Sequence, residues 1–168
     1  INSFAQFPLI SIAITASILG AQAIGAGHSE RLPAIARTAL TINLLLGGAT
    51  ALVSSLFARP LLRIFITDEQ VLHVAVELLY IVLWSGLLFG AFASLSALMR
   101  ASGDVVVPTA ITIAVLTVLE LPLAWLLSQR FGLIGIWVAF PLSYSITLGL
   151  QTWYYKAVWK KRPIRKMV

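Results

Sequence analysis

Long apolar stretches separated by short polar segments dominate this chain from end to end. Each stretch is close to the roughly 20 helical residues that cross a bilayer core about 30 Å thick. Within the stretches, hydroxyl, amide and glycine positions recur every three or four residues, as in helices with one more polar face. We therefore predict an all-α polytopic transmembrane helix bundle with five spanning helices, at residues 4–24, 39–58, 74–99, 105–127 and 133–155.

The composition supports a membrane protein and excludes an ordinary soluble domain. Hydrophobic residues make up 60% of the 168 residues and charged residues only 11%, whereas soluble domains carry about 25% charged residues. There is no cysteine, so nothing indicates a disulfide framework or a thiolate metal site. The chain begins at Ile1 without Met or a signal-peptide pattern, and we expect it to be a fragment or processed product of a longer protein.

Basic residues predict the orientation in the membrane. Of the twelve Lys and Arg residues, six lie from Lys156 onward, in a tail at 156–168. Together with Arg31, Arg37 and Arg100 they put nine basic residues on one side, against three on the other. The positive-inside rule then makes the tail cytoplasmic, in a plasma membrane or bacterial inner membrane. The role of basic residues in membrane topology thus explains the net charge of +6, and no nucleic-acid partner is needed to account for it. Binding of lipid headgroups or of a partner by the tail is a lesser alternative.

The helix at 105–127 contains the residue with the strongest functional signal, Glu120. A carboxylate inside hydrocarbon costs several kcal/mol on insertion scales of roughly 2.5–3.5 kcal/mol for a charged residue. Pro122 removes a backbone donor at the same depth. We take Glu120 as the candidate proton or cation coupling residue, facing the bundle interior or a cavity. The alternatives are a structural carboxyl group and a side chain that snorkels to the outer interface.

Polar residues on the same helical faces are candidates for lining a solute cavity. Thr109 and Thr117 share the face of Glu120, and Tyr144 and Gln151 share a face of the last predicted helix. Polar stripes on several membrane helices can line a water-filled path. The alternative for each hydroxyl is a hydrogen bond that only holds the bundle together. Pro122 and Pro141 are candidate positions of helix bending.

Two further signals concern packing and helix boundaries. Gly86 and Gly90 form a small-xxx-small pattern, which favours close helix packing in lipid. Ser29 is a candidate N-cap, followed by Pro33 in the first turn of a helix, and Asp68 is a candidate start of the helix before residue 74.

No motif for enzyme chemistry is present in the sequence. Neither His28 nor His73 has a second His or a Cys three or four residues away, so a metal site is not expected. There is no Ser–His–Asp set, and Gly25 is followed by Ala26 rather than the Lys of a phosphate loop. We therefore expect a protein that is not an enzyme and has no cofactor.

Ordered motifs along the chain resemble those of one transporter family. They are Gly25–Arg31 (GAGHSER), Met99–Asp104 (MRASGD) leading to Pro108, Glu120–Trp125 (ELPLAW), Phe131–Trp137 (FGLIGIW) with Pro141, and Trp159–Lys161 (WKK). In this order and spacing they resemble the C-terminal half of multidrug and toxin extrusion (MATE) transporters. The resemblance covers nearly the whole chain, and its five helices would be helices eight to twelve of twelve.

The resemblance implies a function and a set of partners. Such proteins have two lobes around a central cavity and use alternating access to export cationic, often aromatic, molecules in exchange for protons or sodium ions. An N-terminal lobe missing from this chain would be its partner. The alternatives are a related flippase for lipid-linked saccharides and a non-transporting membrane scaffold. The flippase hypothesis is disfavoured because such proteins tend to hold the pyrophosphate of their substrate with basic cavity residues. No Lys or Arg lies inside the five apolar runs of this chain.

The chain departs from one branch of that family at a specific position. That branch carries a cation-site acid about ten residues before the arginine of the loop motif. Here that region is Leu88–Gly90, which is apolar. We therefore expect no cation site of that kind on this helix.

Overall fold

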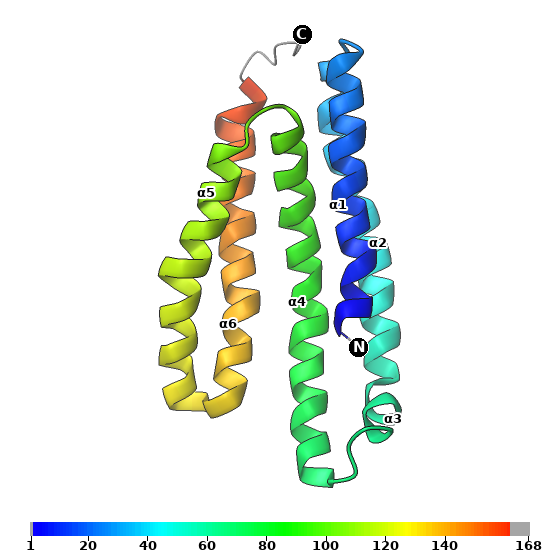
Figure 1. Cartoon of the computed structure of the whole chain (residues 1–168), viewed down its shortest axis with the longest axis vertical. Coiled ribbons are helices and arrows are strands. Elements are labelled where there is room, and N and C mark those ends of the chain that lie inside the picture. The colour runs from blue at the N-terminus through cyan, green and yellow to red at the C-terminus, as the bar shows by residue number, and fades with distance from the viewer. Residues whose placement is uncertain (1, 162–168) are drawn as a thin grey trace.

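The computed structural model describes residues 2–161, which form an all-α transmembrane bundle with no strand in that range. Figure 1 shows the long helices side by side along the long axis of the molecule. The elements are α1 (Asn2–Gly25), the 3-10 turn η1 (Ser29–Arg31), α2 (Leu32–Leu56), α3 (Ala58–Arg63), α4 (Glu69–Ala101), α5 (Val106–Ala114), the π-helical η2 (Val115–Glu120), α6 (Leu121–Ala157) and the 3-10 turn η3 (Trp159–Lys161). Residues 162–168 of the predicted basic tail lie outside the described part of the chain.

Helix α4 is the centre of the bundle. It contacts α1 and α2 on one side and α6 on the other (Figure 1). Gly86 and Gly90 are buried on it, which confirms the packing face predicted from their spacing. At this face Asn43 of α2 donates a hydrogen bond from Nδ2 to the carbonyl oxygen of Leu87 at 3.1 Å.

Four helical segments have the length and hydropathy to cross a membrane: Gln6–Gly25, Ser29–Leu56, Glu69–Ala101 and Val106–Ala157. The last contains 52 residues, too many for one pass at about 1.5 Å per residue through about 30 Å of hydrocarbon. It reverses direction at Gly132, and Figure 1 shows its two arms next to each other. These arms lie where the sequence predicts helices at 105–127 and 133–155.

The reversal at Gly132 depends on a backbone conformation that suits glycine. Its φ of 58° and ψ of −136° lie in a region that a side chain makes costly. Three residues later the arms come very close, since a β-carbon at Gly135 would overlap the carbonyl oxygen of Leu127. Two glycines therefore hold the α5–α6 hairpin closed at this end.

Local capping explains where α4 begins and ends. Asp68 accepts hydrogen bonds from the backbone N–H groups of Gln70 (2.8 Å) and Val71 (3.2 Å), so the predicted start signal is confirmed. At the other end, Gly103 has φ 89°, and the N–H of Asp104 donates to the carbonyl oxygen of Met99 at 3.2 Å. This is the Schellman arrangement, in which glycine supplies the left-handed residue after a helix.

The start of α2 differs from the prediction. The helix begins at Leu32, with Pro33 in its first turn, and so includes Arg37 and the residues before 39. Ser29 is not its N-cap, because it belongs to the 3-10 turn η1 and no side-chain cap is formed there. Proline favours this early start, since its fixed φ suits the first helical turn and its missing N–H would be unpaired there anyway.

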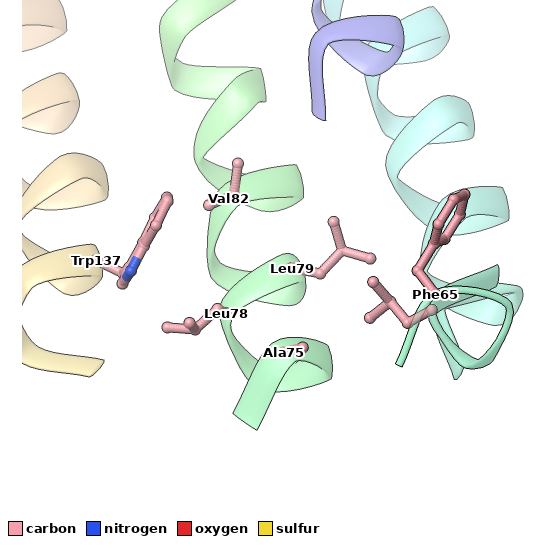
Figure 2. Close-up of a pocket in the computed structure, with 7 residues that line it drawn as sticks. Phe65, Ala75, Leu78, Leu79, Val82 and Trp137 are labelled. Carbon is pink, nitrogen blue, oxygen red and sulfur yellow. The ribbon is translucent and has the colours of Figure 1, made fainter. Parts of the chain in front are cut away.

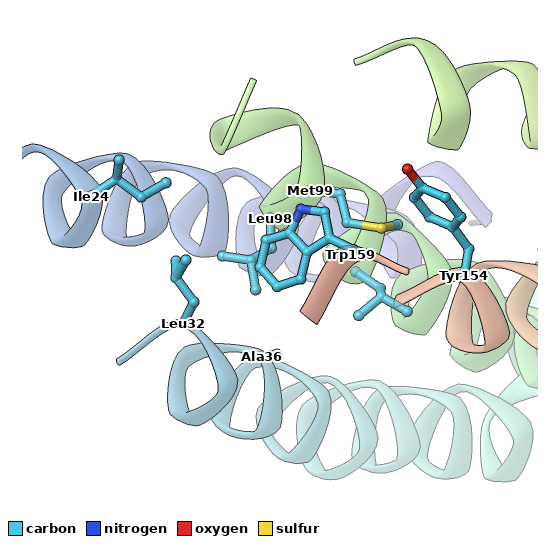
Figure 3. Packing of buried hydrophobic residues seen from close by; sticks show 8 residues of the cluster. Ile24, Leu32, Ala36, Leu98, Met99, Tyr154 and Trp159 are labelled. Atoms are coloured by element: carbon cyan, nitrogen blue, oxygen red, sulfur yellow. The ribbon is translucent and has the colours of Figure 1, made fainter. Parts of the chain in front are cut away.

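The main hydrophobic cluster lies at the end of the bundle where α6 finishes. Figure 3 shows side chains from α1, α2, α4 and the C-terminal part of the described chain meeting there. Its buried members are Ile24, Leu32, Ala36, Leu95, Leu98, Met99, Tyr154 and Trp159. The α1–α2 connection and the α4–α5 connection lie at this same end (Figure 1), so the segments that carry most of the basic residues are held together.

Candidate functional site

Glu120 is the last residue of the π-helical segment η2 and directly precedes the turn that contains Pro122. Proline at 122 has no N–H, and its ring would clash with the carbonyl of Val118 four residues earlier in a regular α-helix. A π-helical turn is one way for a helix to accommodate such a break, and such turns often lie at functional sites. The sequence pair Glu120–Pro122 therefore marks a real irregularity in the helix.

The polar neighbours of Glu120 come from α6. Ser143 faces its carboxyl group, and Tyr144 lies close enough to interact with it electrostatically. Within residues 2–161, neither Oε2 of Glu120 nor Oγ of Ser143 has a hydrogen-bond partner, although both atoms are buried. An unpartnered buried polar atom costs about 1–3 kcal/mol, a cost that a proton or a polar ligand bound at these atoms would offset.

Tyr144 links the carboxyl group to a group of aromatic rings between α4 and α6. Its ring centroid lies 5.8 Å from that of Phe89, 5.6 Å from Phe92 and 6.2 Å from Phe140. Aromatic rings next to an acid provide both a stacking surface and a negative partner, which suits organic cations.

Gln151, another predicted cavity residue, is completely buried between α5 and α6. Its Nε2 donates to Oγ1 of Thr112 at 3.1 Å and lies 3.4 Å from the carbonyl oxygen of Pro108. The structure thus brings Gln151 together with Thr112, which the candidate set omitted. Ser143 was omitted too, and the signal for it is its four-residue spacing to Thr147 and Gln151 on α6.

The two other threonine candidates lie apart from this contact. Thr109 is partly buried near the start of α5. Thr117 is exposed, and its hydroxyl donates to the carbonyl oxygen of Ile113 on its own helix at 2.8 Å. Glu120, three residues later in the same π-helical segment, is half-buried.

The two prolines have different local structures. Pro122 follows the π-helical segment, whereas Pro141 lies inside α6 without leaving helical geometry. The change of direction in α6 is at Gly132. Bending at Pro122 and Pro141 during function stays a prediction.

Asp104, in the predicted loop motif, is bound by α6. The hydroxyl of Tyr154 donates to its Oδ2 at 2.5 Å, and Nε1 of Trp159 donates to Oγ of Ser102 at 2.8 Å. The sequence motif therefore fixes the α4–α5 connection to the end of α6.

Two apolar cavities lie away from Glu120. One, of about 510 Å³, lies between α3, α4 and α6, and Figure 2 shows Trp137 on one side of α4 and Phe65 on the other. The second, of about 740 Å³, lies between α1 and α2 and includes Ser11, Thr15 and Thr38. By contrast, Asn43 and Gly47 of α2 are buried in helix packing rather than in this cavity.

Across residues 2–161, no three His, Asp or Glu side chains gather into a metal-binding cluster. His28 pairs with Glu30 at 3.1 Å, and His73 lies 3.5 Å from Glu77 on α4.

Comparison with known proteins decides the family. Residues 1–126 match the family model described as MatE. The chain belongs to the MatE family. This confirms the family expected from the sequence motifs, and the matched range includes the motifs at Gly25–Arg31, Met99–Asp104 and Glu120–Trp125.

Two curated relatives of this MatE chain are similar over essentially its whole length. It is 38% identical over 170 residues to the probable multidrug resistance protein YoeA of Bacillus subtilis (strain 168), an alignment that covers 100% of this chain and 37% of the relative. It is 23% identical over 168 residues to the probable multidrug resistance protein NorM of Thermotoga maritima, covering 98% of this chain and 36% of the relative. The chain thus spans little more than a third of either relative. No solved structure matches it significantly.

Proposed function

We propose that this MatE chain forms part of a secondary-active exporter of small cationic or aromatic molecules, driven by exchange for protons or sodium ions. Its family membership and the names of its two relatives support transport. The observation that carries the proposal is the buried, unpartnered carboxyl oxygen of Glu120 at a π-helical break inside a membrane helix. Ionisable groups inside membrane segments most often mark ion or substrate paths.

In this proposal Glu120 couples the cation to the access state. A proton or cation from outside neutralises the carboxylate, and the neutral and charged forms favour different conformations of the bundle. A ligand shifts such an equilibrium only by its difference in affinity between the two states. The π-helical segment ending at Glu120 and the proline at 122 supply a place where the helix can change shape.

Substrate contacts are proposed for the aromatic group and for the threonine hydroxyls of α5 and η2. Tyr144 with Phe89 and Phe92 presents rings next to the acid. Thr109 and Thr117 remain candidate cavity residues on α5 and η2. Gln151 is 0% exposed, so it would reach a substrate only after α5 and α6 separate.

We further propose that this chain works with another lobe and sits in the plasma or bacterial inner membrane with the end of α6 in the cytoplasm. The first part is supported by the 37% and 36% coverage of its relatives. The second is supported by the basic residues near that end, which include Arg31, Arg37, Arg100, Lys156 and Lys160, against Arg59, Arg63 and Arg130 near the other.

The test is solute transport by the full-length gene product in proteoliposomes. Ethidium is a suitable probe because it is cationic and aromatic. The proposal predicts accumulation of ethidium against its gradient when a pH or sodium gradient is imposed, and the gradient that works identifies the ion. If neither a pH gradient nor a sodium gradient drives ethidium accumulation in vesicles shown to contain folded protein, the proposal is contradicted. That result would favour a scaffold or a flippase.

A further inference from the structure

A single file of polar side chains on α6 connects the level of Glu120 with the end of the bundle that holds Asp104. Ser143, Thr147 and Gln151 follow each other at four-residue intervals and are 1%, 3% and 0% exposed. Residues at this spacing lie on one face of a helix. Tyr154, the next buried residue on this side, donates to Asp104 at 2.5 Å.

The file faces α5 and η2. Gln151 contacts Thr112 and Pro108 of α5, and Ser143 faces Glu120 at the end of η2. We call this contact between α5–η2 and α6 the α5–α6 seam, made of Pro108, Thr112, Glu120, Ser143, Thr147, Gln151 and the pair Tyr154–Asp104.

Several buried polar atoms of the seam have no hydrogen-bond partner in the described chain. They are Oε2 of Glu120, Oγ of Ser143 and Oε1 of Gln151. Successive file residues are about 6 Å apart along the axis, at about 1.5 Å per residue. That distance equals two hydrogen bonds of about 2.8–3.0 Å in line, which is the spacing that one bridging water provides.

The charges around the seam allow an excess proton to pass. No Lys or Arg occurs in residues 105–129 or 131–155, so neither arm carries a fixed positive charge into the seam. The titratable groups that face its two ends are Tyr144 beside Glu120 and Tyr154 beside Asp104. Arg100, at the end of α4, donates to Oγ of Ser96 at 2.8 Å.

We propose that the α5–α6 seam is a proton path that joins Glu120 to Asp104 at the end of the bundle where α6 finishes. The proposal rests on Glu120 being the coupling acid. Protonated Glu120 gives one proton to the file, and one proton leaves at Asp104. Each hydroxyl or water between them accepts one proton and passes one on, so none changes its net protonation. Gln151 cannot relay in this way, so the hydroxyl of Thr112 relays the proton at the level of Gln151. Gln151 acts as a positioning residue through its 3.1 Å bond to that hydroxyl.

The test removes the relay hydroxyls without removing volume. In full-length protein in proteoliposomes, Thr147→Val and the pair Ser143→Ala/Thr147→Val are compared with wild type. We expect pH-gradient-driven ethidium transport and the accompanying proton flux to fall about tenfold. Exchange of labelled for unlabelled substrate at equal pH needs no net proton movement and should stay at the wild-type rate. Thr147→Ser, which keeps the hydroxyl, should restore the driven rate.

The matched control is Ser145→Ala. The hydroxyls of Ser145 and Thr147 both donate to the carbonyl oxygen four residues earlier, at 2.7 Å and 2.8 Å, but Ser145 is exposed and lies outside the seam. It should transport like wild type. A wild-type driven rate in both seam variants, while Glu120→Gln abolishes it, would overturn the proton path and leave Glu120 as the coupling acid. A wild-type rate in Glu120→Gln as well would instead overturn the proposed function of Glu120. If the double variant fails to fold, the isosteric Thr147→Val alone decides.

Discussion

Gly90 of α4 lies directly against the side-chain amide of Asn43 on α2, so closely that a β-carbon at position 90 would overlap Oδ1 of Asn43. Asn43 is 2% exposed and donates to the carbonyl oxygen of Leu87. The contact leaves no room for an acidic side chain at position 90. An acidic side chain at position 90 would collide with Asn43 and separate the two helices.

This contact predicts that Gly90→Ala destabilises the bundle. Inserting a methyl group into a packed core costs about 1–3 kcal/mol, and we expect a lower unfolding temperature of the full-length protein in detergent. Gly48→Ala on α2 is the matched control, since a β-carbon there meets nothing within 4 Å. The double variant Asn43→Ala/Gly90→Ala should recover part of the loss, because contacting residues are not additive. Equal unfolding temperatures for the two glycine variants would show that the close contact between Gly90 and Asn43 does not contribute to stability.

Gly132 gives a second prediction, which concerns backbone conformation alone. Its φ is 58°, and a β-carbon at 132 would meet nothing within 4 Å. Gly132→Ala should therefore lower stability by about 1–3 kcal/mol through strain and not through a clash. Gly149→Ala on α6, which is also uncrowded but helical, should be neutral or stabilising by about 0.5–1 kcal/mol. Thermal unfolding of the two variants compares them directly, and a Gly132→Ala protein as stable as wild type would argue against the tight reversal.

The bond between Tyr154 and Asp104 predicts a cost for removing one hydroxyl. Tyr154→Phe keeps the ring in the hydrophobic cluster but loses a bond to a carboxylate, worth about 1.5–3 kcal/mol. Tyr80→Phe is the control, because its hydroxyl is exposed and lies 3.4 Å from the carbonyl oxygen of Ser55. We expect Tyr154→Phe to lower the unfolding temperature clearly more than Tyr80→Phe. Equal effects would mean that Asp104 does not hold the end of α6.

The proposed orientation predicts which loops a membrane-impermeant thiol reagent reaches. This chain has no cysteine, so a single cysteine can be introduced into it as the probe. In intact cells, Gln129→Cys near the α5–α6 reversal should be labelled, whereas His28→Cys between α1 and α2 should be labelled only after the cells are opened. The reverse pattern would place the end of α6 outside the cell and contradict the charge-based assignment.

The sequence was sufficient for the class, the family and the approximate helices, because long apolar runs and the motifs around Gly103 and Pro122 are local signals. Asp68 as a cap and Gly86–Gly90 as a packing face could be predicted for the same reason. What failed depended on geometry between helices or on helix irregularity. The π-helical turn at 115–120 was not predicted, and α2 begins at Leu32 rather than directly after Ser29.

The candidate site could be predicted only in part. Glu120 was identified as an acid inside an apolar run and Tyr144 from helical periodicity, and the structure places them near each other. Ser143 and Thr112 were missed because their importance comes from facing another helix, at Glu120 and Gln151 respectively. A single helical wheel shows which side of a helix is polar, but not which neighbouring helix that side meets.

The central claim is that Glu120 couples solute movement to a cation, and Glu120→Gln in the full-length protein tests it most directly. Two rates are measured in the same proteoliposomes: accumulation of ethidium driven by a pH or sodium gradient, and exchange of labelled for unlabelled ethidium without a gradient. Glu77→Gln is the control, since Glu77 pairs only loosely with His73 at 3.5 Å on α4, away from the site. We predict that Glu120→Gln loses gradient-driven accumulation but retains exchange, while Glu77→Gln keeps both. Gradient-driven accumulation at the wild-type rate in Glu120→Gln would contradict the account.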